Sequence, residues 1–279
     1  MKIIKKAMAP VRIDFAGGTT DISPFKDKYG GCVLNAAINR YVVGKLIADD
    51  DMIHLEYTGN IPTSSGLGTS GVMNLVWLSL ISKEKDKKKL AEGVYGLEQS
   101  MGQVGGKQDQ YAAAFGGINF LEFNKDDVKI TRLNLSSGLI KELESKLVLV
   151  YSGKPHYASD ANGMMINNLR KGKNVKNLLR IKQIAKQMKN ALLKKDLMKF
   201  AELMNEETEE RRKLAKGIVP SDAEKIIGIG MKNGAISAKV CGSGNGGSVL
   251  FFGDKNKLKK VFGKKIIDFR FDFNGLRYL

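Results

Sequence analysis

The sequence predicts an α+β fold, because strand-like segments come first, helical segments follow, and strands return near the end. Residues 3–60 have strand composition interrupted by turns, notably at residues 17–18 and 49–51. Residues 162–214 are almost free of glycine and proline and place apolar residues at helical spacing. The final part returns to strands, without the regular strand–helix alternation of a parallel sheet. These observations favour α+β over α/β.

Turn residues divide the first half into short elements. We expect strands over 7–15, 31–34, 41–48, 53–57, 118–123 and 146–151, and helices over 68–82, 85–99 and 109–114. The strand over 146–151 is expected to close this half of the chain. The change of pattern after it predicts an N-terminal nucleotide-binding lobe, residues 1–152, and a C-terminal lobe, residues 153–279.

The second half is expected to begin with the long helical region. A further helix starts at Pro220-Ser221-Asp222 and ends at Asn233-Gly234, since proline is favoured at helix starts and glycine just after helix ends. We then expect strands over 236–240, 248–252 and 266–273, with a helix over 256–262.

The composition is that of an ordinary globular protein, with 279 residues, 43% hydrophobic and 27% charged. No apolar segment follows the charged start at Met1–Lys6, and the longest apolar run, Val72–Ile81, is too short to span a bilayer. Cys32 and Cys241 fit reduced packing residues. We expect a soluble, cytoplasmic protein with no membrane partner.

The net charge of +17 raises the local concentration of anionic ligands. The lysines are spread along the chain, with concentrations over 83–89 and 171–195 that are typical of solvated helix faces. Few aromatic residues lie among them, so a platform for stacking bases is not indicated. The sequence therefore predicts no nucleic-acid partner.

The most informative segment is Ile61–Gly71, which combines glycines and hydroxyl residues directly before the apolar run. Glycine allows the backbone to approach a ligand closely, and the unpaired N–H groups of the helix that follows point at that ligand. Such a terminus binds anions, most often phosphate. The alternative is a glycine-rich turn with serine caps.

Three segments in order resemble the GHMP kinases, the superfamily of galactokinase, homoserine kinase, mevalonate kinase and phosphomevalonate kinase. They are Ala9–Asp21, Ile61–Gly71 and Lys239–Gly247, and the resemblance extends over nearly the whole chain. It implies the GHMP kinase fold, in which an N-terminal ribosomal-S5-like lobe packs on a C-terminal ferredoxin-like lobe.

Within the superfamily the likeness is strongest to the D-glycero-D-manno-heptose 7-phosphate kinases and related sugar 1-kinases. It rests on Ala16-Gly17-Gly18, with Thr20-Asp21 and Ser23-Pro24-Phe25 after it, and on Gly105–Tyr111 further along. Lys107 stands where that family usually has arginine.

The resemblance implies a role for each matching residue. Asp109 would be the base that takes the acceptor's proton, with Arg12 and Lys107 supplying positive charge. Ser70 and Glu98 would bind Mg²⁺. The ATP phosphates would lie against Ser64, Ser65, Gly66, Leu67, Gly68, Thr69 and Ser70. The substrate would contact Gly18, Thr19, Thr20, Asp21, Gly242, Ser243 and Gly244, with His156 as a weaker candidate.

Each of these residues also has a structural interpretation. Glu98 could be a solvated glutamate at a helix end, and Asp109 a helix N-terminal acid stabilised by the dipole. Arg12 could be a surface charge, and Asp21 could form an Asx-turn before Ser23-Pro24. The Asx-turn is compatible with a binding role.

The leading hypothesis is an ATP- and Mg²⁺-dependent kinase for the anomeric hydroxyl of a sugar or sugar phosphate, acting as a monomer or homodimer. One alternative is a GHMP kinase for another small alcohol, such as an isoprenoid-pathway acid or an amino alcohol. Another is a catalytically silent relative that binds a ligand. Fold likeness alone does not separate these possibilities.

Overall fold

The computed structural model describes residues 2–50, 52–62, 64–153, 161–242 and 247–279. Its first sheet consists, in spatial order, of β10 (Arg277–Tyr278), β1 (Ile3–Ala16), β2 (Gly31–Ala48), β4 (Ile118–Phe123) and β5 (Val128–Arg132), with β3 (Ile53–Gly59) also paired to β2. All these pairings are antiparallel. A second antiparallel sheet and helices complete the α+β fold expected from the sequence.

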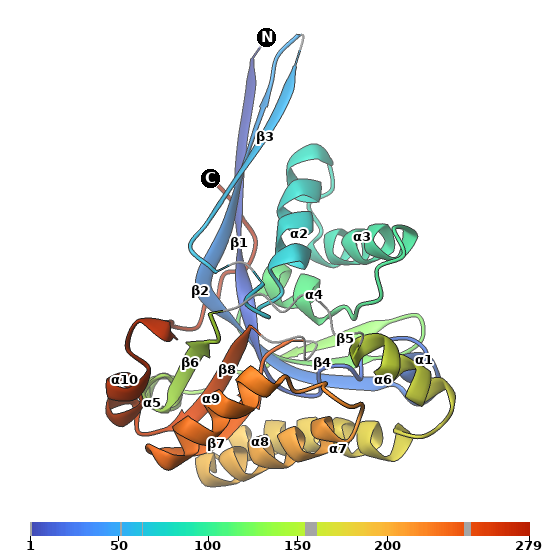
Figure 1. The fold of residues 1–279 in the computed structure, drawn as a ribbon. Helices are drawn as coiled ribbons and strands as arrows, with labels where there is room; N and C mark the ends of the chain where they lie inside the picture. The colour runs from blue at the N-terminus through green and yellow to red at the C-terminus, as the bar shows by residue number, and fades with distance from the viewer. Residues whose placement is uncertain (1, 51, 63, 154–160, 243–246) are drawn as a thin grey trace.

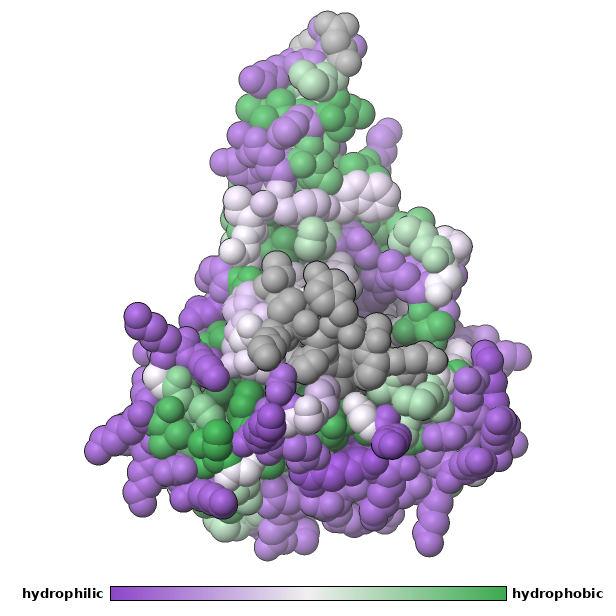
Figure 2. All heavy atoms as spheres, viewed as in Figure 1, coloured by the Kyte–Doolittle hydropathy of each residue, from purple (hydrophilic) through white to green (hydrophobic). Residues whose placement is uncertain are grey.

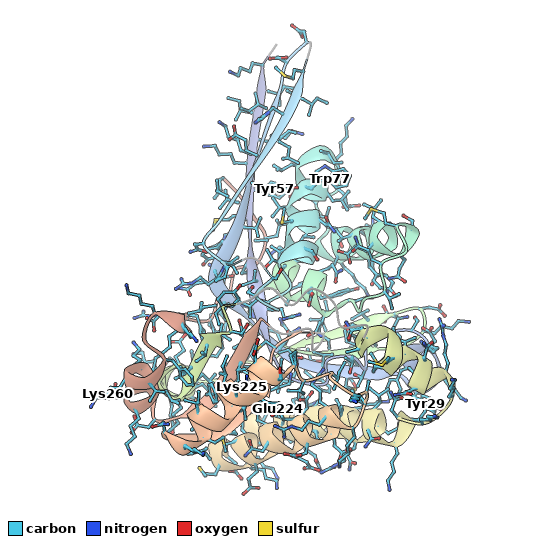
Figure 3. The ribbon with its side chains drawn as sticks, in the orientation of Figure 1. Tyr29, Tyr57, Trp77, Glu224, Lys225 and Lys260 are labelled. Carbon is cyan, nitrogen blue, oxygen red and sulfur yellow. The ribbon has the colours of Figure 1, made fainter. Side chains whose placement is uncertain are left out.

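Strands β1, β2 and β3 extend beyond the rest of the molecule as a three-stranded arm, with the start of the chain at its tip (Figure 1). Hydrophobic and hydrophilic residues alternate along this arm on the face shown in Figure 2. Tyr57 of β3 points toward α2 (Thr69–Ile81), the helix that carries Trp77 (Figure 3). Its hydroxyl donates a hydrogen bond to the carbonyl of Met73 at 3.3 Å, which fastens the base of the arm to this helix.

Strand β2 is continuous where the sequence predicted two short strands, over 31–34 and 41–48. The residues between the two predicted strands include Asn35 and Asn39, whose side chains form hydrogen bonds with neighbouring segments. The Asn35 amide donates to the carbonyl of Gln108 at 3.4 Å, and Asn39 Oδ1 accepts from the N–H of Arg270 at 2.8 Å. Tertiary hydrogen bonds therefore keep this polar stretch in the sheet.

Helices cover both faces of the first sheet. α2, α3 (Lys87–Ser100) and α4 (Gln108–Phe115) lie on the face to which Asn35 points. Leu34 and Phe120 point to the other face, where Lys189 of α7 (Val175–Leu193) lies 4.4 Å from the Phe120 ring centroid. Because both faces are covered there, the first part of β2, residues 31–38, is buried at every position instead of alternating between buried and exposed residues.

The second sheet has the order β7 (Ala235–Val240), β8 (Ser248–Gly253), β6 (Leu147–Tyr151) and β9 (Ile266–Ile267). The sequence assigned β6 to the end of the first half, but the strand pairs with β8 and β9. Leu147 lies opposite Phe252, so the apolar residues of β6 pair with a strand that comes about 100 residues later in the chain. The boundary proposed at residue 152 therefore falls just after a strand of the second sheet.

The end of the chain returns to the first sheet. The strand expected over 266–273 is limited to β9, and Phe271 then forms an isolated bridge with Ile38 of β2. The alternating aromatic residues Phe269 and Phe271 were read as part of the last strand, but they pack into the core shared with Phe15.

The remaining helices pack around the second sheet and beneath the first (Figure 1). They are α5 (Ser137–Lys146), α6 (Ala161–Arg170), α7, α8 (Leu197–Arg212), α9 (Ser221–Lys232) and α10 (Lys255–Phe262), with the short α1 (Phe25–Tyr29) after the first loop. The helical region predicted over 162–214 is confirmed as α6, α7 and α8, whereas β5 and α5 were not predicted. Within the described ranges no helix combines the length and the apolar character needed to cross a bilayer.

An aromatic cluster joins the two sheets. Phe200 of α8 lies with its ring centroid 5.3 Å from that of Phe15 in β1 and 6.0 Å from that of Phe252 in β8. All three side chains are almost completely buried in one core. One face of the second sheet therefore shares a core with the first sheet, whereas its other face, with Val148 and Phe251, packs in a second core.

We predict that Phe200→Ala lowers the free energy of unfolding by about 3–5 kcal/mol, because it opens a cavity where the sheets meet. Urea denaturation measures the loss. Met198→Ala, on the exposed side of the same helix, is the control and should change stability by less than about 0.5 kcal/mol. A loss below about 1 kcal/mol for Phe200→Ala would contradict a shared core.

Candidate active site

A cavity of about 460 Å³ lies where two loops meet the end of α3 and the start of α4. The first loop is residues 17–24, between β1 and α1, and the glycine-rich loop is residues 64–68, before α2. It brings together many residues that the sequence singled out: Arg12, Thr19, Asp21, Ser64, Ser65, Gly66, Gly68, Thr69, Ser70, Glu98, Asp109 and Gly242. Gly18, Thr20, Leu67 and Lys107 lie outside its lining. Ser243, Gly244 and His156 fall outside the described residues.

The glycine-rich loop leads directly into α2, as expected. Gly68 has φ of +80°, and a Cβ atom there would lie 2.8 Å from the Asp109 carboxyl carbon, so only glycine fits this position. The first N–H groups of α2, which starts at Thr69, have no intrahelical partners because of helix geometry. No side chain caps them at Gly68 either. Leu67 is buried in the core and anchors the loop from beneath.

Arg12 connects this loop to the start of α4. Its Nε donates to Asp109 Oδ1 at 2.7 Å, and its Nη1 donates to the Gly66 carbonyl at 2.7 Å. Arg12 is 3% exposed, whereas the Asp109 side chain is 27% exposed and faces the cavity. Burial opposes the charge on Arg12, but the nearby Asp109 and Asp14 leave its pKa above the ordinary value. The guanidinium therefore holds an accessible carboxylate in a fixed orientation.

Glu98 comes from the end of α3 and lies across the cavity lining from the start of α2. Its Oε1 accepts from the Asn74 amide at 2.9 Å and its Oε2 from the Gln110 amide at 2.5 Å. Burial raises the pKa of Glu98, against which these amide donors act. Each carboxylate oxygen keeps a free lone pair.

Among the described residues no cluster of three His, Cys, Asp or Glu side chains could hold a metal ion. Mg²⁺ does not need one, because it is commonly bound by one or two protein oxygens together with phosphate oxygens and water. Ser70 and Glu98 both line the cavity, and the Glu98 carboxylate is oriented by two amides. This donor set fits a magnesium ion bound together with a phosphate ligand.

Asp21 lies at the other end of the cavity. Its Oδ2 accepts from the N–H of Gln108 at 3.1 Å, whereas its buried Oδ1 has no partner. Burial, followed by the nearby charges of Asp109 and Asp14, raises the pKa of Asp21 to about 6 from an ordinary value of 3.8. An unpartnered buried acceptor at a cavity wall is suited to a hydroxyl donor from a ligand.

The two threonines before Asp21 have different positions. Thr19 has φ of +77° and lines the cavity. Thr20 is fully buried; its hydroxyl donates to the carbonyl of Gly17 at 2.7 Å, with that of Cys32 also within reach at 3.0 Å, and accepts from the N–H of Cys32 at 3.0 Å. Thr20 therefore holds the shape of the loop from behind.

Lys107 is directed away from the cavity. Its Nζ lies 2.6 Å from Glu92 Oε2 and 4.7 Å from the ring centroid of Tyr95, both on α3. The Tyr111 hydroxyl donates to the other Glu92 oxygen at 2.5 Å. Lys107 thus joins α3 to α4, and no sequence pattern had indicated Glu92 as its partner.

Sequence reasoning also missed Asn74, Gln108 and Gln110, which bind or flank the acidic side chains of the site. Gln108 and Gln110 enclose Asp109 in the sequence, a spacing that could have marked them. Asn74 lies within the apolar run of α2, and a lone amide in such a run is the signal that was available.

Protein-family models match two parts of the chain. The GHMP kinases N terminal domain matches residues 32–117, and the GHMP kinases C terminal model matches residues 188–264. A full-length relative is the D-glycero-alpha-D-manno-heptose 7-phosphate kinase of Campylobacter jejuni, which is 32% identical over 99% of each chain. The bifunctional fucokinase/GDP-fucose pyrophosphorylase of Arabidopsis thaliana is 24% identical over 92% of this chain and 30% of its own length.

Solved structures share the fold along the whole chain. A D-glycero-D-manno-heptose 1-phosphate kinase from Bacteriodes thetaiotaomicron superimposes with a TM-score of 0.79 at 24% identity, covering 99% of both chains. A putative sugar kinase from Campylobacter jejuni gives a TM-score of 0.76 at 26% identity, covering 99% of this chain and 98% of its own.

The raised pKa of Asp21 predicts a loss of stability with rising pH. Because the folded chain holds this proton more tightly than the unfolded chain, the contribution of Asp21 is greatest below pH 4 and declines as the pH approaches and passes about 6. The decline should reach about 3 kcal/mol at most. Urea denaturation at pH 4 and pH 7 should show this difference in the wild type relative to Asp21→Asn, and equal pH dependence in both would contradict it.

Proposed function

The chain belongs to the GHMP kinase family and is a sugar kinase, and from that premise we propose that it transfers the γ-phosphate of Mg-ATP to the anomeric hydroxyl of a sugar. A heptose 7-phosphate is the first candidate acceptor, since the full-length relative is a kinase of that substrate. The observation that carries the proposal is the Arg12–Asp109 pair, which presents a carboxylate to the cavity beside the glycine-rich loop.

Asp109 would accept the proton of the reacting hydroxyl. Arg12 occupies Oδ1, which leaves Oδ2 for the acceptor. An anomeric hydroxyl is more acidic than an ordinary alcohol, so a carboxylate oriented by a guanidinium is a sufficient base. Arg12 would act by orienting Asp109 and the Gly66 carbonyl.

Asp21 would fix the sugar. Its unpartnered Oδ1 would accept a hydrogen bond from a sugar hydroxyl, and Thr19 and the backbone of Gly242 would lie beside it. Gly18 and Thr20 would shape the loop rather than contact the ligand, and Lys107 would brace the start of α4. This acceptor-rich end of the cavity suits a polyol better than an apolar acid.

The phosphates of ATP would lie against the N–H groups of residues 64–70, at the positive end of α2. Ser70 and Glu98 would hold Mg²⁺, which neutralises charge that develops on the transferring phosphoryl group. Asn74 and Gln110 would keep the Glu98 carboxylate directed toward it. We also propose a cytoplasmic location and a monomeric or homodimeric state.

We predict that Asp109→Asn lowers the turnover of sugar phosphorylation by about 10²–10⁴-fold, because it removes the base without changing the size of the side chain. Mg-ATP consumption is measured with heptose 7-phosphate, mannose, fucose, galactose, mevalonate and homoserine, for the wild type and the variant. Asp127→Asn, which removes an exposed carboxylate paired with Lys88, is the matched control.

Wild-type transfer to one sugar at the anomeric position, lost in Asp109→Asn and kept in Asp127→Asn, supports the proposal. Transfer to mevalonate or homoserine alone would replace the sugar by another small alcohol. Absence of both Mg-ATP binding and turnover would leave a silent, ligand-binding relative.

We further predict that Glu98→Gln raises the Mg²⁺ concentration needed for Mg-ADP binding by roughly tenfold or more, because one of the proposed metal ligands loses its charge. Isothermal titration calorimetry at a series of Mg²⁺ concentrations reads this without catalysis. Glu84→Gln, on the segment before α3, should leave the requirement unchanged. An unaltered Mg²⁺ requirement in Glu98→Gln would remove Glu98 from the metal site.

A further inference from the structure

Four charged side chains lie completely buried beneath the first loop. They are Asp14 of β1, Glu207 and Arg211 of α8, and Lys239 of β7. Lys239 Nζ lies 3.0 Å from Asp14 Oδ2 and 3.7 Å from Glu207 Oε1. Arg211 Nη2 donates to Glu207 Oε1 at 2.6 Å. We call these residues the buried quartet; its formal charges cancel, and it joins both sheets through α8.

The buried quartet touches the loop that leads to Asp21. Arg211 Nη2 also donates to the carbonyl of Gly18 at 3.1 Å, across 193 residues of sequence. A Cβ atom on Gly18 would lie 2.2 Å from Asp14 Oδ2, so the loop rests directly on the carboxylate and requires glycine there. The next residue, Thr19, is in the left-handed region with φ of +77° and lines the cavity.

Stability alone does not account for such a cluster. Removing a charge from water costs several kcal/mol per ion, and well-packed apolar residues of similar volume often replace a buried ion pair without loss. The buried Gly18 carbonyl accepts from the Thr19 hydroxyl within the loop and from Arg211 of α8, and only the second bond ties its orientation to another element. An apolar residue at position 211 cannot supply this second donor. Arg211 supplies that donor, and its planar guanidinium reaches Glu207 and Gly18 together.

We propose that Arg211 is a positioning residue for acceptor binding: through the Gly18 carbonyl it holds Thr19, Thr20 and Asp21 in the conformation that receives the sugar. Glu207, Lys239 and Asp14 hold Arg211 in place. The proposal rests on the assignment of Asp21 to the acceptor in the proposed function. Helix α8 contributes no residue to the described cavity lining. The proposal therefore gives this helix an effect on acceptor binding and none on nucleotide binding.

The test compares two charge-balanced double variants of neighbouring arginine–glutamate pairs. Glu207→Gln with Arg211→Met removes the pair that contacts Gly18 and leaves Lys239 paired with Asp14. The control is Arg212→Met with Glu224→Gln, which removes the 2.7 Å pair between Arg212 of α8 and Glu224 of α9. Glu224 is labelled in Figure 3. Arg211→Lys, which keeps the charge but not the planar fork, is the conservative third variant.

We expect the KM for the sugar to rise by about 10- to 100-fold in Glu207→Gln/Arg211→Met. The Kd for Mg-ADP should stay within about twofold of the wild-type value. The KM for the sugar in Arg211→Lys should lie between those of the wild type and the double variant. Amide hydrogen exchange over residues 17–22 should become faster in the double variant and remain unchanged in the control pair.

Sugar KM and loop exchange that match the control pair would overturn the proposal. A double variant in which sugar binding, nucleotide binding and thermal stability all fall together would also overturn it. That result would give the buried quartet a structural role only. If the wild type phosphorylates no sugar, the proposed function fails separately, and the exchange measurement still decides whether Arg211 orders the loop.

Discussion

The site depends on the ion pair between Arg12 and Asp109. It joins β1, the glycine-rich loop and the start of α4, which are widely separated in the sequence. A buried guanidinium needs an opposite charge and acceptors for its donors, and Asp109 and the Gly66 carbonyl provide both. The backbone N–H of Arg12 also donates to the Leu67 carbonyl at 3.1 Å, so one residue fixes the loop by both its main chain and its side chain. Arg12 therefore fixes the positions of the Asp109 carboxylate and of the glycine-rich loop together.

Much of this arrangement could be predicted from the sequence, because short glycine-containing motifs carry it. The loop before α2, the position of Asp109 in the first turn of α4 and the presence of Asp21 at the cavity all follow from local patterns. The continuous β2 could not be predicted, since Asn35 and Asn39 stay in the sheet through partners distant in sequence. Lys107 was expected at the site because the Gly105–Tyr111 motif places it two residues before Asp109, but its Nζ pairs with Glu92 on α3. Glu207 and Arg211 stand on the same helical face as the core residues Phe200 and Met204, a pattern that marks buried charge and was overlooked.

The net charge of the whole chain and the charge of the cavity have opposite signs. The described lining contains one cation, Arg12, and three carboxyl groups, those of Asp21, Glu98 and Asp109. Lysines lie mainly on the outer sides of the helices, where hydrophilic residues cover the lower part of the molecule in Figure 2. Under the proposed function an anionic nucleotide would meet an acidic lining, and a Mg²⁺ ion held by Glu98 together with the phosphates would relieve the repulsion. Burial, with a smaller contribution from the charge of Asp109, raises the pKa of both Asp21 and Glu98.

The contact of Phe200 with Phe15 and Phe252 limits how the molecule can move. Rigid-body hinge opening between the sheets would pull these rings apart and expose apolar surface on both sides. Ligand exchange is thus left to short segments at the mouth of the cavity. Residues 102–105 are suited to this gating role, because Val104 is exposed and neither Gly102 nor Gly105 has any atom within 4 Å of the position of a Cβ. The aromatic contact thus favours local movement of short segments over hinge opening between the sheets as the route of ligand exchange.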